Sequence, residues 1–157
     1  MITIRKQIHN NAVALISLFI AVGSLAYNTW RNETTEEQRN VRHASFRVLE
    51  NLGELQQVVD MRYYYLPFEG NTEREGDLRI RGFGNAAMIH DLMMLMPAPA
   101  PAAGKVLNLQ WNGYFASLDD INASGKHTPQ ASEAERLLTR AIRDARQAVL
   151  DVLKKLE

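Results

Sequence analysis

Residues 82–87, GFGNAA, match the pattern G-x-G-x-x-A of dinucleotide-binding folds. In such folds the glycines follow a strand and allow a helix N-terminus to approach a pyrophosphate. The only strand-like residues before this pattern are 78–81, LRIR, and the chain lacks the alternation of strands and helices that the fold requires. The pattern therefore predicts a loop that leads into a helix, without nucleotide binding.

Residues 88–96, MIHDLMMLM, combine a histidine with four methionines. Imidazole and thioether groups are suitable ligands for Cu(I). On a helix, however, Ile89, Met93 and Met96 share one face, whereas His90 and Met94 share another. Because the ligands diverge, we expect the methionines to fill a hydrophobic core, and we expect no metal ion and no cofactor.

The remaining residue types that could support catalysis are isolated from one another. The chain has no cysteine, which excludes disulfides and thiolate chemistry. The four histidines show no H-x-x-x-H spacing, and no serine lies in a G-x-S-x-G context. Lys plus Arg equals Asp plus Glu at 18 each, so the charge balance does not indicate a nucleic-acid partner. The sequence gives no support for an enzyme.

Aromatic residues are the candidates for contact with other molecules. Tyr63, Tyr64 and Tyr65 form the densest aromatic cluster in the chain. They are interpreted either as the packing of a helix end against neighbouring loops or as a surface for a protein partner or the membrane. Tyr27 and Trp30 are interpreted as membrane-interface residues, because amphipathic aromatic side chains prefer the level of the lipid headgroups.

An apolar segment places Tyr27 and Trp30 at its end. Residues 12–27 contain no charge and no proline, and extension to Trp30 gives a helix of roughly 28 Å, against a bilayer core of about 30 Å. Arg31 follows and can extend to the headgroups. We expect a transmembrane helix over residues 12–30 that acts as a signal anchor, after a short basic N-terminus at residues 1–11.

Two alternatives to a retained anchor remain open. Ser24-Leu25-Ala26 is a small-x-small site of the kind that a signal peptidase cleaves, so the segment is also compatible with a secretion signal. Against cleavage, the apolar pattern continues past this site to Trp30. The second alternative is a buried helix of a soluble protein, because small and polar residues such as Gly23 lower the hydropathy of the segment.

The flanking charges bear on topology. Arg5 and Lys6 precede the apolar segment, whereas four arginines interleaved with acidic residues follow it. A short basic N-terminus before a first apolar helix usually stays inside, and long domains translocate largely regardless of charge. We expect the N-terminus inside and the following domain outside the cytoplasm, in the periplasm.

Residues 27–33, YNTWRNE, stand directly after the short apolar helix. This arrangement resembles that of small uncharacterised bacterial single-pass membrane proteins, which have an N-terminal anchor helix and a helical domain. The resemblance covers the first third of the chain. It implies location in the bacterial inner membrane and brings no activity and no site residue with it.

Residues 31–157 are expected to form helices with apolar stripes. Thr34 with Glu37 offers a capping box, so either a new helix begins at Thr35 or the membrane helix continues without a break. An amphipathic helix then extends to about residue 65, and Pro67 and residues 70–71 are expected to stop it. Residues 71–81 are expected to be a loop, 85–96 a helix, and 97–103 an extended Pro/Ala-rich connector.

Residues 105–121 fit a helix better than a hairpin turning at Asn112-Gly113. Thr128 followed by Pro129 is a typical helix start, and the apolar stripe after it continues to the C-terminus. Residues shared by these stripes form the expected core: Leu52, Leu55, Trp111, Leu118, Leu138 and Val149.

The expected fold is therefore all-α, with an N-terminal transmembrane helix followed by an antiparallel four-helix-bundle-like domain. The leading hypothesis is a membrane-anchored scaffold or accessory subunit that acts through protein–protein contact. Its partners would be membrane lipid along residues 12–30 and a protein partner or a homo-oligomer, with no nucleic acid. The alternative is a small-molecule-sensing helical bundle at the membrane.

Overall fold

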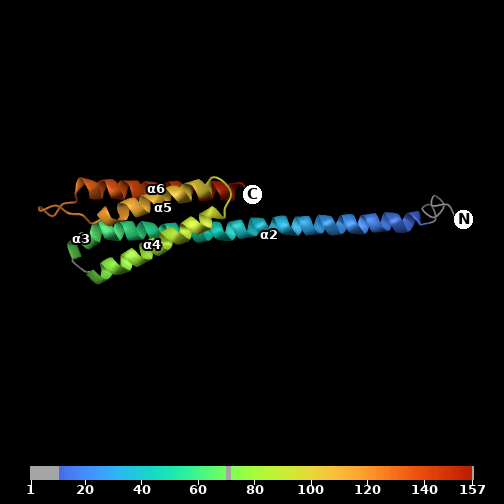
Figure 1. Cartoon of the computed structure of the whole chain (residues 1–157), viewed down its shortest axis with the longest axis horizontal. Coiled ribbons are helices and arrows are strands. Elements are labelled where there is room, and N and C mark those ends of the chain that lie inside the picture. Colours follow the sequence, from blue (N-terminus) through green and yellow to red (C-terminus); the bar gives the residue numbers. More distant parts are fainter. Residues whose placement is uncertain (1–10, 70–71, 157) are drawn as a thin grey trace. The chain divides into compact units, whose positions relative to one another are not determined.

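The computed structural model describes residues 11–69 and 72–156, and these residues form an all-helical structure without a strand (Figure 1). The expectation of an all-α protein is confirmed. The elements are α2 (Ala12–Asp60), the π-helical turn η1 (Met61–Tyr65), α3 (Leu66–Glu69), α4 (Thr72–Met94), α5 (Ala100–Tyr114), the short 3-10 turn η2 (Phe115–Ser117) and α6 (Pro129–Lys154).

The chain divides into two compact units, with the boundary between Asn40 and Val41. The apolar part of α2 belongs to the first unit. Among the described residues it is the one helical segment that is long and apolar enough to cross a membrane, and none of its most apolar window is buried. This assignment rests on the length and composition of the helix, which a signal sequence shares.

The helix does not stop after Arg31. The hydroxyl of Thr34 donates to the carbonyl of Trp30 at 3.0 Å, and that of Thr35 donates to the carbonyl of Arg31 at 2.8 Å. Both hydroxyls therefore bond to the preceding turn of a continuous helix, and the capping box expected at Thr34 does not form. Of the two arrangements considered for this segment, the structure has the continuous one.

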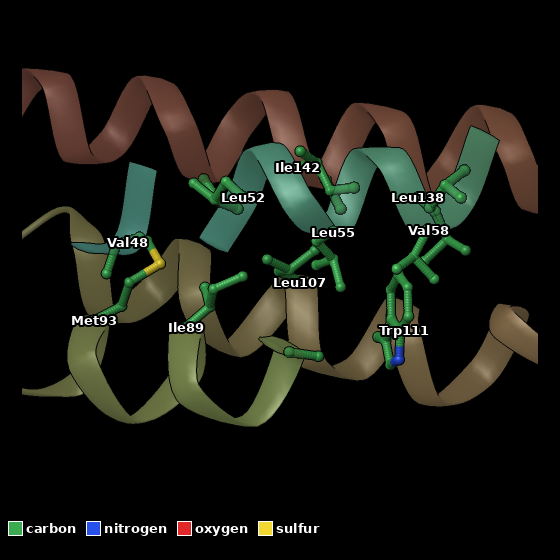
Figure 2. Packing of buried hydrophobic residues seen from close by; sticks show 14 of the residues in the cluster. Val48, Leu52, Leu55, Val58, Ile89, Met93, Leu107, Trp111, Leu138 and Ile142 are labelled. Carbon is green, nitrogen blue, oxygen red and sulfur yellow. The ribbon is translucent and has the colours of Figure 1, made fainter. Parts of the chain in front are cut away.

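The second unit has one hydrophobic core, to which α2, α4, α5 and α6 all contribute (Figure 2). The apolar stripes expected on these helices point into it, because side chains three or four residues apart share a helix face. The six residues expected at its centre are all buried: Leu52, Leu55, Trp111, Leu118, Leu138 and Val149. Ile89, Met93 and Met96, which were expected to share one face, are buried as well.

Polar contacts between helices fix their register. On α2, Arg42 donates to the carbonyl of Leu156 at 3.1 Å, and Gln56 donates to the hydroxyl of Thr139 at 3.1 Å. The amide of Asn85 on α4 donates to the carboxylate of Glu54 at 3.0 Å. These contacts join α2 to α6, to the residues that follow α6, and to α4.

Gly82 shows why the G-x-G-x-x-A pattern is present. It lies inside α4, and a Cβ atom there would be 2.5 Å from Cζ2 of Trp111 and 3.2 Å from Cγ1 of Val58. The glycine allows α4 and α5 to approach each other around a buried indole. The expected loop at residues 82–87 is wrong, and the first glycine of the pattern serves helix packing.

The loop expected at residues 71–81 is also wrong, because α4 begins at Thr72. Glu73 and Glu75 lie in its first turn, where carboxylates interact favourably with the helix dipole. Leu78, in the second turn, is buried and ties the start of α4 to the core. The dense charges that suggested a loop lie on the exposed sides of this helix.

The extended Pro/Ala-rich connector at residues 97–103 is shorter than expected, because α5 already begins at Ala100. Pro101 lies in its first turn, where a missing N–H costs little. A tight turn around Pro99 makes the connection, with the amide of Ala100 bonded to the carbonyl of Pro97 at 3.2 Å.

The helix expected over residues 105–121 is present but ends at Tyr114, followed by η2. Asn112-Gly113 lies within α5, so the hairpin alternative is wrong. Ile121 instead forms an isolated antiparallel bridge with His127 in the loop before α6. At the start of α6 the hydroxyl of Thr128 accepts from the amide of Ala131 at 3.1 Å, which confirms the expected N-cap.

Candidate partner-binding site

The three tyrosines at residues 63–65 belong to η1, a single π-helical turn between α2 and α3. Pro67 follows in α3 and has no N–H to donate to the preceding turn. In η1 the amide of Leu66 donates to the carbonyl of Met61, five residues earlier. This wider turn lets the helix continue through Pro67, which does not stop it. The helix ends at Glu69. Residues 70–71, the other expected stop, lie outside the described residues.

Arg62 holds this turn against the rest of the domain. Its side chain is only 5% exposed, and its Nε and Nη2 donate to one carboxylate oxygen of Asp119 at 3.2 and 2.9 Å. The carboxylate of Glu75 lies 3.8 Å from Nη2, and the guanidinium carbon lies 4.4 Å from the centre of the Phe115 ring. Arg62 thus connects η1 with α4 and with the residues around η2.

Tyr63 points inward and is the most enclosed of the three tyrosines. Its ring stacks on His127 with centroids 3.9 Å apart and an interplanar angle of 11°. Its hydroxyl lies 3.2 Å from that of Ser132, within hydrogen-bonding distance. For Tyr63 the helix-end packing interpretation therefore describes the contacts, and Tyr63 secures the loop before α6.

Tyr64 and Tyr65 are about half exposed, and Phe68 is 61% exposed. We call these three residues the aromatic surface. Partial burial raises the pKa of Tyr64, and the carboxylates of Glu135 and Asp60 act in the same direction. The phenol, which is protonated at neutral pH even at its ordinary pKa, keeps its hydrogen-bond donor to more alkaline pH. Aromatic residues of this type are frequent at protein interfaces because they combine apolar area with a polar group.

The second group of expected site residues lies in the first unit. The rings of Tyr27 and Trp30 are 6.2 Å apart, and both side chains are exposed, as is Arg31. They follow the apolar part of α2, so their order along the helix agrees with an interfacial role. Their position in a membrane stays a prediction.

Sequence reasoning did not identify the residues that support the aromatic surface. Arg62, Asp119 and His127 come from distant parts of the chain, and Phe68 follows a proline that was expected to end the helix. An arginine within the apolar pattern at the end of a helix is one signal that could have identified Arg62, because a buried guanidinium requires a carboxylate partner.

The described residues contain no group of three or more His, Asp or Glu that could hold a metal ion. A shallow pocket of about 340 Å³ lies between the end of α5 and the start of α6, lined by Gly113, Tyr114, Ser117, Pro129, Gln130 and Glu133.

No protein-family model matches the sequence, and no curated protein or solved structure is significantly similar to it.

Proposed function

We propose that the protein is a single-pass membrane protein whose helical domain acts through protein–protein contact, as a scaffold or an accessory subunit. The observation that carries the membrane part is the uncovered apolar segment of α2. Val13, Phe19 and Leu25 are 78%, 76% and 69% exposed. A continuous apolar surface of this length is unfavourable in water and favourable in a bilayer.

The proposed domain is an antiparallel four-helix bundle. The shared core of α2, α4, α5 and α6 supports it. Two pairings, Arg42 with Leu156 and Gln56 with Thr139, support α6 running opposite to α2. The pairing of Glu54 with Asn85 and the approach of Val58 to Gly82 support the same for α4.

The proposed topology has the N-terminus in the cytoplasm of a bacterial cell and the bundle in the periplasm. The basic residues Arg5 and Lys6 support this orientation, although they lie outside the described residues. The likeness of residues 27–33 to small bacterial single-pass proteins is in line with it. Protease protection of the N-terminal segment tests the topology.

The proposed contact site is the aromatic surface. Its residues are exposed, while Arg62 and Tyr63 beside them are held by buried or stacked contacts. A rigid support with exposed aromatic groups is typical of residues that dominate binding energy at interfaces. Binding would cover Tyr64, Tyr65 and Phe68 without rearranging the core.

Site-specific photo-crosslinking in native membranes tests this contact. A photoreactive phenylalanine analogue in place of Tyr65 is expected to give a discrete crosslinked product. The same analogue in place of Tyr114, a partly exposed tyrosine on α5, serves as the matched control and is expected to give little product. Equal yields at both positions would contradict the assignment of the aromatic surface.

The alternative function, small-molecule sensing, is favoured by the pocket between α5 and α6. A ligand that binds only the folded state raises its stability by about 2.7 kcal/mol at 100 times its dissociation constant. A metabolite that raises the melting temperature of the wild type but not of a Tyr114→Ala variant would support sensing over the scaffold.

A further inference from the structure

The outer face of α4 carries a seven-residue repeat. Asp77, Gly84 and Asp91 are spaced by seven residues, and Ile80 and Ala87 lie between them at the spacing of a coiled coil. All five residues are exposed, and they lie opposite the buried stripe of α4. We call these five residues the α4 seam.

The outer face of α6 carries basic residues at the same spacing, flanked by the carboxylates of Asp144 and Asp151, the second of which accepts from Gln147 at 2.9 Å. Arg140, Gln147 and Lys154 are spaced by seven residues, with Arg143 and Leu150 between them. These five residues are also exposed and lie opposite the buried stripe of α6, and we call them the α6 seam. Neither Arg140 nor Lys154 has an ion-pair partner within the described part of the chain.

The two seams match each other in length and charge. Asp77 and Asp91 are fourteen residues apart, as are Arg140 and Lys154, so both pairs span about 21 Å of helix. When each aspartate of the α4 seam faces Arg140 or Lys154, Gly84 in the middle of the α4 seam faces Gln147 in the middle of the α6 seam.

The middle of the match suits close packing. A Cβ atom at Gly84 would have no heavy atom within 4 Å, so the backbone of α4 is open to approach at this point. In the same register Gly84 faces Gln147, and Ala87 faces Leu150. The apolar side chain of Ile80, 75% exposed, lies beside Arg143 in this register and would lose water on contact.

The direction of the helices is compatible with a contact between two copies. In the proposed bundle α4 and α6 both run opposite to α2, so α4 and α6 run in the same direction. The charges pair in either direction, but Ile80 and Ala87 meet Arg143 and Leu150 only when the α4 of one copy and the α6 of the next run parallel.

We propose that the α4 seam of one copy binds the α6 seam of a second copy in a parallel, coiled-coil-like contact. The proposal rests on the proposed function only through the shared membrane. Because each copy carries both seams on different helices, the contact is heterologous and builds a ring or a row of copies. An anionic lipid surface would attract the α6 seam but would repel Asp77 and Asp91.

The charges of the α4 seam are available for this contact. The carboxylate of Asp77 lies 3.6 Å from Arg81, and that of Asp91 lies 3.2 Å from His90. Both pairs are within α4, and both aspartates are largely exposed. Surface pairs of this kind contribute little to stability and exchange readily with a partner.

Disulfide trapping in the full-length chain tests the proposal, since the sequence has no cysteine. A chain with Asp91→Cys and Lys154→Cys is expected to form a ladder of covalent oligomers when membranes are oxidised. A chain with Lys105→Cys and Lys154→Cys, with Lys105 exposed on α5, is the control and is expected to stay monomeric. An absent ladder, or an equal ladder in both chains, would overturn the seam contact.

A glycine pair separates contact from folding. Adding Gly84→Leu to the trapping chain is expected to lower the yield of covalent oligomers about tenfold, because the added side chain overpacks the interface and weakens the contact. Gly113→Leu, at an exposed glycine on α5 that is equally open, is expected to leave the yield unchanged. Equal effects of the two variants would contradict the proposal.

Fractionation of the same cells distinguishes a failure of the seam contact from a failure of the membrane anchor. Membrane-bound chains without a ladder would overturn the seam contact and leave the anchor in place. Chains found only in the soluble fraction would overturn the anchor itself.

Discussion

Replacing Arg62 with alanine is expected to lower the free energy of unfolding by about 3 kcal/mol. The substitution leaves the carboxylate of Asp119 without its two hydrogen bonds and removes the cation that packs on the Phe115 ring. Because Asp119 is 21% exposed and stays partly hydrated, the loss is at the low end for a broken buried ion pair. Thermal unfolding of the full chain in detergent, followed by circular dichroism, measures it.

The control for this substitution is Arg47→Ala. Arg47 forms an exposed ion pair with Glu50 at 2.9 Å on the same helix, with both side chains about 60% exposed. Its removal is expected to change the free energy of unfolding by at most about 0.5 kcal/mol. Equal melting temperatures for the two variants would show that Arg62 does not hold η1 to the domain.

Leu138→Ala is expected to cost about 2–5 kcal/mol, because Leu138 is fully buried and its removal leaves a cavity among α2, α5 and α6. For a domain of this size the melting temperature should fall by roughly 10 °C. The membrane span is not part of this core, so membrane insertion should not change.

The matched control is Leu109→Ala on α5, where the leucine is 72% exposed. This variant is expected to melt within a few degrees of the wild type, because little apolar area leaves the protein interior. If Leu138→Ala melted like Leu109→Ala, the core described for the second unit would be wrong.

The sequence predicted the all-α class and the centre of the core because the apolar stripes of the helices are strongly periodic. Leu52, Leu138 and Val149 each belong to a stripe that only mutual packing removes from water. The prediction of the N-cap at Thr128 succeeded for a similar reason, since its chemistry is local.

The errors concern residues whose conformation depends on contacts elsewhere. Gly82 appeared to favour a loop, but it lies inside a helix, where its lack of a side chain leaves space for Trp111 on α5. Residues 71–81 appeared too charged for a helix, yet Leu78 buries one side of that helix against the core. Pro101 appeared to extend the connector, whereas the first turn of α5 accepts it.

The candidate site was predictable only in part, because it too depends on contacts between distant parts of the chain. The tyrosine cluster is visible in the sequence, but the division between an inward Tyr63 and an exposed Tyr65 is not. That division depends on the π-helical turn before Pro67 and on the ion pair between Arg62 and Asp119, which join residues 57 positions apart.

The mass of the protease-protected fragment in bacterial spheroplasts tests the central claim most directly. A retained anchor with the bundle in the periplasm predicts that trypsin removes the bundle and leaves a fragment that begins at Met1 and ends at Arg31 or Arg39. A protected full-length chain would place the bundle in the cytoplasm. Loss of any N-terminal fragment, together with a mature chain that begins at Tyr27, would show a cleaved signal peptide and contradict the membrane-anchored protein.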